Sequence, residues 1–313
     1  MFRWMAVAFL SVSTAAQAQD PRLYTIGSGD VNGSYYAAAT ALCQETNRAK
    51  TALRCSPEAT PGSIYNMEAL RNRQLDFAIV QSDVQTMALT GEGPFVGKPA
   101  FSDLRSVMSL YPETLTVLSR PDAHILSLGG LVGKRVDIGL AASGRQATAM
   151  RLLTALGLDR TDFRALLELS TGTGLDELCA GRIDATVLIL GHPSSVVDRA
   201  INECDARLVN ISGPEVRAFI EANDDYVYSS IPRSVYGKKG RILSIGVLAT
   251  LVTRTDMPDD IVAAIIKNTI ANLPSIGVSA AVLEKLSVRD MQESGLAAPL
   301  HPAAATMFAE RGN

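Results

Sequence analysis

The sequence predicts an α/β protein of two lobes, each a mostly parallel sheet flanked by helices, with two strands crossing between the lobes. Strand patterns followed by helix patterns recur along the chain, which is typical of parallel sheets covered by helices. The 313 residues are enough for two domains of ordinary size. Two similar strands bracket the middle third of the chain, as expected when one lobe is inserted into the other.

The first lobe opens with a series of strand–helix units. A strand over residues 23–27 ends in glycine, and residues 34–47 have helical periodicity. The next elements predicted are a strand at 54–59, a helix at 64–73, a strand at 75–80 and a helix that opens at Gln81-Ser82-Asp83. This βαβα order indicates a largely parallel sheet.

A second unit of the same kind begins near Ser127. Its predicted elements are a strand at 133–139, a helix at 146–156, a strand at 163–169, a helix at 174–180, a strand at 183–190 and a helix at 194–202. The strand at 183–190 is apolar without alternation, which is typical of a strand buried on both faces.

Two strands are expected to act as hinges between these units. Residues 115–120 end in Ser-Arg-Pro-Asp, and residues 248–254 end in Thr-Arg-Thr-Asp. We therefore predict a first lobe of residues 19–118 plus 242–313 and an inserted second lobe of residues 119–241. The segment from Ile261 onward is helical in pattern and is expected to pack back on the first lobe.

The first 18 residues have the pattern of a secretory signal peptide. Arg3 supplies the positive start, residues 4–12 are a short apolar run, and Ala16-Gln17-Ala18 is a small-x-small cleavage site. The run is shorter than the ~20 apolar residues of a spanning helix. An uncleaved N-terminal anchor is the alternative. We expect an exported chain that begins near Gln19.

Charge and cysteine content limit the partners and the compartment. Removing Arg3 changes the formal charge from −3 to −4, so the surface is not basic and nucleic acid is not an expected partner. An even number of cysteines in an exported chain favours disulfides over buried thiols, although three pairings are open. We choose the nearest neighbours, Cys43 with Cys55 and Cys179 with Cys204. The spacing does not match a zinc site.

Five polar segments follow predicted strands or open predicted helices, where ligands bind at the carboxyl edge of a parallel sheet. They are Gly27 to Tyr36, Thr60 to Ser63, Gln81 to Asp83, Ser143 to Gln146, and Gly191-His192-Pro193. Backbone N–H groups and the positive dipole at such helix starts favour anions. Each serine alone is explained as an N-cap, and the glycine loop alone as a tight turn. Their convergence favours a ligand.

Catalytic patterns are missing from the sequence. The three histidines lack metal-pair spacing, no G-x-S-x-G elbow is present, and Ser82-Asp83 lacks an identifiable base. His192 beside Pro193 is interpreted as fixing a turn. Asp83 and Glu113 are interpreted as acceptors for a ligand amine or as structural hydrogen-bond partners. We expect neither an enzyme nor a metal or cofactor.

Together the motifs resemble the substrate-binding subunits of the TAXI branch of TRAP transporters, which are tripartite, ATP-independent and periplasmic. The resemblance spans nearly the whole mature chain. It rests on the glycine loop with Tyr35-Tyr36, the segments T-x-G-S…N at 60–66 and Q-S-D at 81–83, S-L-Y-P-E at 109–113, G-K-R-V-x-I-G-x-x-x-S-G at 133–144, G-R-I-D-A at 181–185, G-H-P at 191–193, I-P…Y at 231–236 and H-P-A at 301–303.

This resemblance implies a type II periplasmic binding protein that closes over a ligand and delivers it to a TRAP membrane permease. Uptake would be driven by an ion gradient. The family's relatives favour glutamate, glutamine or related dicarboxylates. We expect a monomer in the periplasm that binds a small organic acid. The expected ligand-binding residues are Asn32, Gly33, Ser34, Tyr35, Ser63, Gln81, Ser82, Asp83, Glu113, Ser143, Gly144, Arg145, Gln146, Gly191, His192 and Pro193.

Departures from the family pattern bear on the ligand's charge. Asp30 replaces a common glycine, Arg73-Gln74 replaces a usual glycine near a turn, and Arg145 replaces a small residue or threonine. If Asp83 reaches the ligand, an α-amino dicarboxylate is favoured. If Asp83 turns away and Arg145 turns in, a keto- or simple dicarboxylate is favoured. The alternative function is a secreted enzyme, or a sensor or surface antigen, that uses the same cleft.

Overall fold

The computed structural model describes residues 21–49 and 51–310. The predicted signal peptide lies outside the described residues. Among those described, no single helix is long and apolar enough to cross a membrane, and one bent pair of helices, Asp259–Ala271 with Leu273–Ser279, meets that criterion only when its members are taken together.

One curled sheet of ten strands runs through the described part of the chain, in the order β2-β1-β3-β10-β4-β7-β5-β6, with β8 paired to β4 and β9 to β10. The strands are β1 (Arg22–Gly27), β2 (Leu53–Glu58), β3 (Phe77–Gln81), β4 (Leu104–Ser119), β5 (Arg135–Asp137), β6 (Ala165–Leu167), β7 (Ala185–Leu190), β8 (Arg207–Val209), β9 (Val227–Pro232) and β10 (Arg241–Arg254). The sheet is parallel at both ends and antiparallel around β4 and β10.

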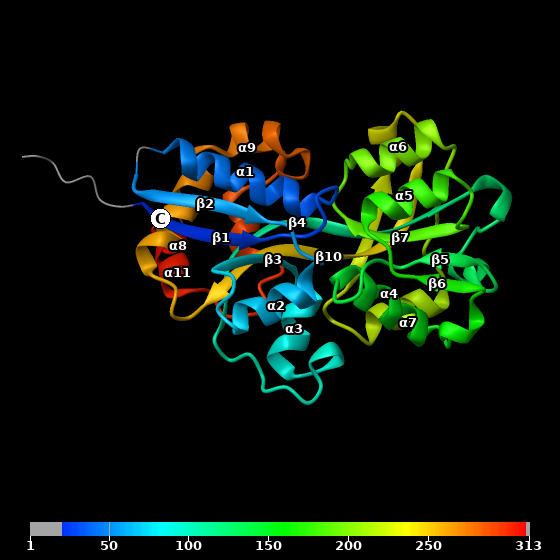
Figure 1. Cartoon of the computed structure of the whole chain (residues 1–313), viewed down its shortest axis with the longest axis horizontal. Coiled ribbons are helices and arrows are strands. Elements are labelled where there is room, and N and C mark those ends of the chain that lie inside the picture. Colours follow the sequence, from blue (N-terminus) through cyan, green and yellow to red (C-terminus); the bar gives the residue numbers. More distant parts are fainter. Residues whose placement is uncertain (1–20, 50, 311–313) are drawn as a thin grey trace, which may run out of the picture.

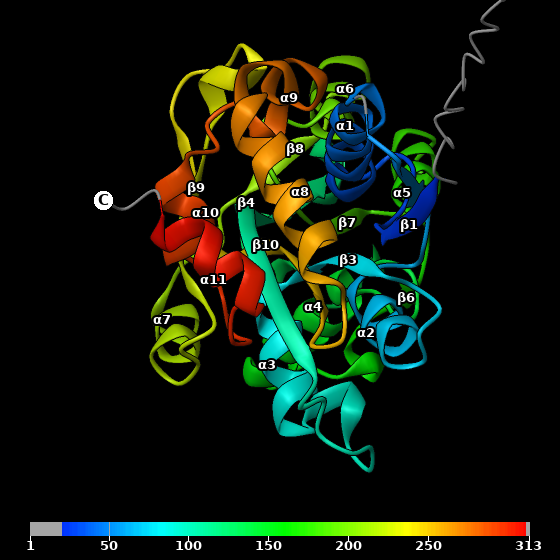
Figure 2. The same ribbon diagram turned by 90° about the vertical axis from the view of Figure 1, so that its left-hand side faces the viewer.

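Helices cover both faces of the sheet, so each lobe has three layers (Figures 1 and 2). The helices are α1 (Ser34–Arg48), α2 (Ser63–Arg71), α3 (Ser82–Thr90), α4 (Gly144–Ala155), α5 (Thr171–Cys179), α6 (Ser195–Glu203), α7 (Pro214–Glu221), α8 (Asp259–Ala271), α9 (Leu273–Ser279), α10 (Val288–Glu293) and α11 (Pro302–Ala309). The first lobe contains β1 to β3, α1 to α3 and the C-terminal helices. The second lobe contains β5 to β9 and α4 to α7 (Figure 1).

Strands β4 and β10 pass from one lobe into the other. Up to Thr114, β4 pairs with β10, and from Thr114 onward it pairs with β7. Strand β10 pairs with β9 up to Gly246 and with β3 from Ala249. The chain therefore crosses twice between the lobes, near Thr114 and near residues 246–249. The first crossing lies at the start of the predicted hinge at 115–120, and the second at the start of the predicted hinge at 248–254. The lobe boundaries at 118/119 and 241/242 stay a prediction.

The predicted strand–helix order of the first lobe is confirmed within a few residues. In the second lobe, β5 and β6 have three residues each, where seven were predicted for each, and α5 begins at Thr171 rather than at Gly174. Strands β4 and β10 are 16 and 14 residues long and extend well beyond the predicted hinges. The elements β8, α7 and β9 were not predicted. Helices α8 to α11 pack on the first lobe as expected.

Each lobe buries apolar side chains on both faces of its part of the sheet. In the first lobe one cluster lies under α1 and α8 and another under α2 and α3. The second lobe has the same arrangement. One disulfide fixes each lobe: Cys43–Cys55 ties α1 to β2, and Cys179–Cys204 ties the end of α5 to the end of α6, with Cα atoms 4.9 and 5.1 Å apart. The pairing is the nearest-neighbour one chosen from the sequence.

Candidate functional site

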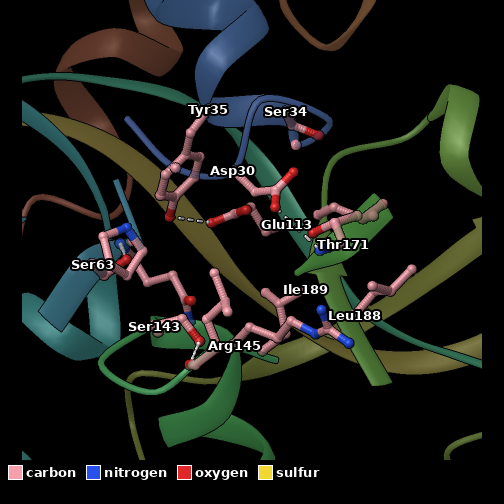
Figure 3. A pocket seen from close by; sticks show the side chains of 18 of the residues that line it. Asp30, Ser34, Tyr35, Ser63, Glu113, Ser143, Arg145, Thr171, Leu188 and Ile189 are labelled. Atoms are coloured by element: carbon pink, nitrogen blue, oxygen red, sulfur yellow. Dashed lines mark hydrogen bonds between the residues drawn. The ribbon is translucent and has the colours of Figure 1, made fainter. Parts of the chain in front are cut away.

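A small cavity lies between the lobes, at the carboxyl ends of their parallel strands (Figure 3). Its volume is about 80 Å³. That is room for roughly half a dozen water molecules or a ligand of similar size. The lining residues are Gly29, Asp30, Gly33, Ser34, Tyr35, Pro61, Gly62, Ser63, Gln81, Glu113, Leu140, Ser143, Gly144, Arg145, Leu169, Thr171, Leu188, Ile189 and Leu190. We call this space the interlobe cavity.

Helix starts from both lobes converge on the interlobe cavity. Residues at the starts of α1 and α2 line it from the first lobe, and residues at the starts of α4 and α5 line it from the second. Helices α4 and α5 are capped by Ser143 and Ser170, whereas α1 and α2 begin after Gly33 and Gly62 and have no side-chain cap. The first N–H groups of an uncapped helix need a partner, and the helix dipole favours an anion there. This arrangement is suited to a carboxylate.

Glu113 is the buried acid of the interlobe cavity. It lies on β4 where that strand reaches the second lobe, and it is 2% exposed. The Tyr35 hydroxyl donates a hydrogen bond of 2.7 Å to its Oε2 (Figure 3). Burial raises the pKa of Glu113 to about 8, the Tyr35 hydrogen bond acts in the opposite direction, and the nearby Asp83 charge raises the pKa further. Glu113 is therefore mainly protonated at neutral pH.

Arg145 lines the cavity, but most of its donors are already used inside the second lobe. Its Nη2 donates to Asp137 Oδ2 and, at 2.8 Å, to Thr186 Oγ1, while its Nε donates to the Val187 carbonyl. Asp137 is fully buried, so the pair is a buried ion pair that ties α4 to the end of β5, and the bonds to Thr186 and Val187 tie α4 to the first half of β7. Burial lowers the pKa of Arg145, and the Asp137 charge opposes that shift. The guanidinium has little hydrogen-bonding capacity left for a bidentate clamp on a ligand.

Asp30 bridges the lobes at the edge of the cavity. Its Oδ1 accepts from the Asn32 N–H at 2.8 Å, and its Oδ2 accepts from the Thr171 N–H at 3.3 Å, across the cleft. The second contact places a carboxylate at the start of α5, where the helix dipole favours negative charge. Asp30 thus has a role in contact between the lobes that the sequence did not indicate.

A buried polar network also joins the lobes behind the cavity. Asp83, in the first turn of α3, is fully buried and accepts hydrogen bonds at Oδ2 from Thr148 (2.8 Å) and Tyr226 (2.6 Å), both in the second lobe. The Gln81 side chain donates to Thr148 at 2.9 Å and to Asp83 at 3.1 Å. Burial raises the pKa of Asp83, and the hydrogen bonds from Tyr226 and Thr148 oppose that shift. We call Gln81, Asp83, Thr148 and Tyr226 the interlobe latch.

Backbone contacts complete the closure. The Tyr65 N–H donates to the Ala142 carbonyl at 3.0 Å across the cleft. Gly144 packs so closely that a Cβ there would meet Gln81 Oε1 and Ser63 Oγ of the other lobe. The lobes are therefore in direct contact around the cavity.

The structure brings many of the expected site residues together, and others lie elsewhere. Nine line the cavity: Gly33, Ser34, Tyr35, Ser63, Gln81, Glu113, Ser143, Gly144 and Arg145. Seven are outside the lining: Asn32, Ser82, Asp83, Gln146, Gly191, His192 and Pro193. Four of the five predicted segments thus contribute. The fifth follows β7, and the end of β7 itself, at Leu188 to Leu190, lines the cavity instead.

His192 is held within the second lobe. Its Nε2 lies 3.0 Å from Thr116 Oγ1, and its Nδ1 is hydrogen-bonded to the Tyr236 hydroxyl. Burial lowers the pKa of His192 to about 4, so the ring is neutral at physiological pH. This placement favours the turn-fixing role over a proton-transfer role. Among the described residues, no group of three or more His, Cys, Asp or Glu side chains is placed to hold a metal ion.

Two lining residues were missed although the sequence carries a signal for them. Thr171 is the first residue of α5 and belongs to the polar stretch Ser170-Thr171-Gly172, and Leu169 directly precedes that stretch. This stretch follows a predicted strand, as the other five segments do. The apolar residue Leu140 has no comparable signal, because its position depends on how the loop before α4 folds.

Comparisons with known proteins agree with this architecture. A model of the NMT1-like family matches residues 26–312. The chain is similar to the structure of MatC from Rhodopseudomonas palustris with bound malate, with a TM-score of 0.61, 13% identity and coverage of 93% of this chain and 96% of that one. It is also similar to the periplasmic binding protein BugD, with a TM-score of 0.58, 10% identity and 94% coverage of both chains. The chain belongs to the NMT1-like family and has the two-lobed fold of the periplasmic binding proteins.

Proposed function

We propose that this protein is the periplasmic solute-binding subunit of a TAXI-type TRAP transporter. It captures a small organic acid in the interlobe cavity and delivers it, unchanged, to a membrane permease. The observation that carries the proposal is the convergence of helix starts from both lobes on one small cavity. A carboxylate there can accept hydrogen bonds from N–H groups at the starts of α1 and α2 that have no side-chain cap, and the helix dipoles favour it.

Closure supplies the rest of the binding energy. The cavity is bounded on one side by the apolar residues Leu140 and Leu169 and the end of β7, which keep water away from that side of a bound acid. Polar contacts are stronger in that water-poor setting. Cross-lobe hydrogen bonds at the interlobe latch and at Asp30 form only when the lobes meet. Ligand and latch together therefore favour the closed state.

Delivery in the periplasm is supported by the two disulfides. Such bonds persist in oxidising compartments and are rare in the cytosol. The candidate ligands are glutamate, glutamine, 2-oxoglutarate and succinate. All four are small acids that carry the carboxylate favoured by the helix starts.

Isothermal titration calorimetry of the purified mature chain with these four acids tests the proposal. Thermal-shift measurements run in parallel, with sulfate as an inorganic anion control. We expect one-to-one binding of at least one acid, a rise in melting temperature, and recovery of unchanged acid by mass spectrometry after incubation. No heat and no thermal shift with any of the four acids would refute the organic-acid proposal. Conversion of the acid would instead indicate an enzyme.

A further inference from the structure

Glu113 presents an oxygen to the interlobe cavity that the protein itself does not use. Its Oε2 accepts a hydrogen bond from the Tyr35 hydroxyl, whereas the described residues form no hydrogen bond to its Oε1. The side chain is 2% exposed and points among the lining residues (Figure 3). Oε1 is not one of the fully buried atoms that lack a partner, so it keeps contact with the cavity, where a ligand can reach it. A bound ligand is the natural partner for this oxygen.

The surroundings of Glu113 disfavour its negative charge. Burial raises the pKa of Glu113, the charge of Asp83 on α3 raises it further, and the hydrogen bond from Tyr35 on α1 acts in the opposite direction. Tyr111 lies two residues away on β4 and has a raised pKa, so it is neutral. Strand β10 contributes no titratable group here, because it passes Glu113 with Gly246, Val247 and Leu248. The remaining charged residues of the lining are Asp30, on the loop before α1, and Arg145, at the start of α4.

The positive charge of Arg145 is already paired with the charge of Asp137. Its ion pair with the fully buried Asp137 leaves it unable to serve as the counter-ion of an ionised Glu113 without uncovering a second buried acid. Asp30 is an acid and supplies no counter-ion. Because Oε2 accepts a hydrogen bond from the Tyr35 hydroxyl, a proton carried by Glu113 sits on Oε1, the other oxygen of this cavity-lining side chain.

We propose that Glu113 acts as a neutral carboxylic acid that donates a hydrogen bond from Oε1 to an oxygen of the ligand, and so selects oxo- and dicarboxylic acids over α-amino acids. This inference rests on the proposed function, because it concerns the same cavity. The first carboxylate of the ligand lies at the uncapped helix starts, and its second oxygen, from an oxo group or a second carboxylate, lies at Glu113. Asp83 does not offer an alternative site for an amine, since the interlobe latch holds it outside the lining.

The opposite assignment would require an ionised Glu113 paired with a ligand ammonium. The two assignments differ in the sign of their proton linkage. A donor Glu113 must be protonated in the complex, so its pKa rises on binding, and a proton is taken up once the pH exceeds the free-state pKa of about 8. An ionised Glu113 would release a proton on binding below that pH.

Calorimetry over a pH series separates the two assignments. 2-Oxoglutarate, succinate and glutamate are titrated from about pH 6 to about pH 9.5, in pairs of buffers with different heats of ionisation. We expect the affinity for 2-oxoglutarate or succinate to be constant below about pH 7 and to fall towards tenfold per pH unit above about pH 8. Near pH 6.5 the better of these acids should bind at least about tenfold more tightly than glutamate.

Variants of Glu113 test whether this residue causes the pH dependence of ligand binding. Glu113→Gln keeps a donor in the same place but does not titrate, so we expect the affinity for the preferred acid near pH 6.5 to stay within about tenfold of wild type and its pH dependence to disappear. Glu113→Ala has no donor and should bind less tightly than Glu113→Gln. Glu92→Gln, an exposed position, is the matched control and should reproduce the wild-type curve.

The results that overturn the inference differ from those that overturn the proposed function. Proton release on binding with glutamate as the tightest ligand overturns the donor role of Glu113, as does a wild-type affinity that does not change with pH. In both cases the protein still binds an organic acid. Failure of all acids at every pH overturns the proposed function itself.

Discussion

Removing the Thr148 hydroxyl should weaken ligand binding through the interlobe latch, without touching the cavity. Thr148→Val replaces a side chain that is 1% exposed with one of nearly equal size. The variant loses two hydrogen bonds between the lobes. In one, the Thr148 hydroxyl donates to Asp83 Oδ2 at 2.8 Å, and in the other it accepts from the Gln81 side-chain amide at 2.9 Å. Thr148 is absent from the lining, so a change in affinity reports closure rather than ligand contact.

The magnitude follows from the chemistry of these two bonds. A hydrogen bond to a carboxylate contributes about 1.5–3 kcal/mol, and a neutral one contributes about 1 kcal/mol. In the open state water forms these two hydrogen bonds with the protein, so the substitution destabilises only the closed state, by about 3 kcal/mol. Because about 1.4 kcal/mol changes an equilibrium constant tenfold, we expect the dissociation constant of the preferred acid to rise by about 100-fold.

Titration calorimetry with the acid that wild type binds most tightly measures this effect. The matched control is Thr154→Val, an exposed threonine on the same helix, and we expect it to bind as wild type does. Small-angle scattering with the acid at saturating concentration should give Thr148→Val the radius of gyration of the closed protein. A change in affinity of less than about threefold for Thr148→Val would refute the latch.

Two further predictions concern stability. Arg145→Met leaves the fully buried Asp137 without its counter-ion, so the free energy of unfolding by urea should fall by about 3–5 kcal/mol, and a loss below about 1 kcal/mol would contradict the structural role of the ion pair. Replacing Cys179 and Cys204 together by serine opens a cross-link of sequence separation 25 and should cost about 3 kcal/mol of unfolding free energy, whereas an unchanged urea midpoint would contradict the disulfide.

Local patterns explain how much of the fold could be predicted. The first lobe was predicted within a few residues because its strands and helices carry their own periodicity. Strands β4 and β10 were predicted too short because each contains a residue typical of a strand end, Pro112 and Gly246, at the point where the strand leaves one lobe for the other. The stretch from β8 to β9 was missed because its elements are short and depend on pairing with these two crossing strands.

The cavity was predictable in position but not in the direction of each side chain. Helix starts after parallel strands must meet at one edge of the sheet, and for this reason four of the five predicted segments line the cavity. Whether Asp83 faces the ligand or the other lobe depends on Thr148 and Tyr226, which are 65 and 143 residues away in the chain. Similarly, Arg145 forms an ion pair with Asp137, which lies eight residues earlier in the chain, and this sequence separation alone does not predict the pair.

The central claim is that the lobes close over a small organic acid in the interlobe cavity, and Gly144→Ala tests it most directly. A Cβ at Gly144 meets Gln81 and Ser63 across the cleft, so the lobes can close as in the wild type only if these two side chains move from their hydrogen-bonded positions. Gly129→Ala, where the only neighbouring atom lies 3.9 Å away, is the control.

The measurement is calorimetric titration of wild type and both variants with glutamate, glutamine, 2-oxoglutarate and succinate. We predict one-to-one binding of at least one acid by wild type and Gly129→Ala, and binding by Gly144→Ala that is weaker by about 100-fold or more. If Gly144→Ala binds the acid as tightly as wild type does, the acid does not bind in the closed interlobe cavity.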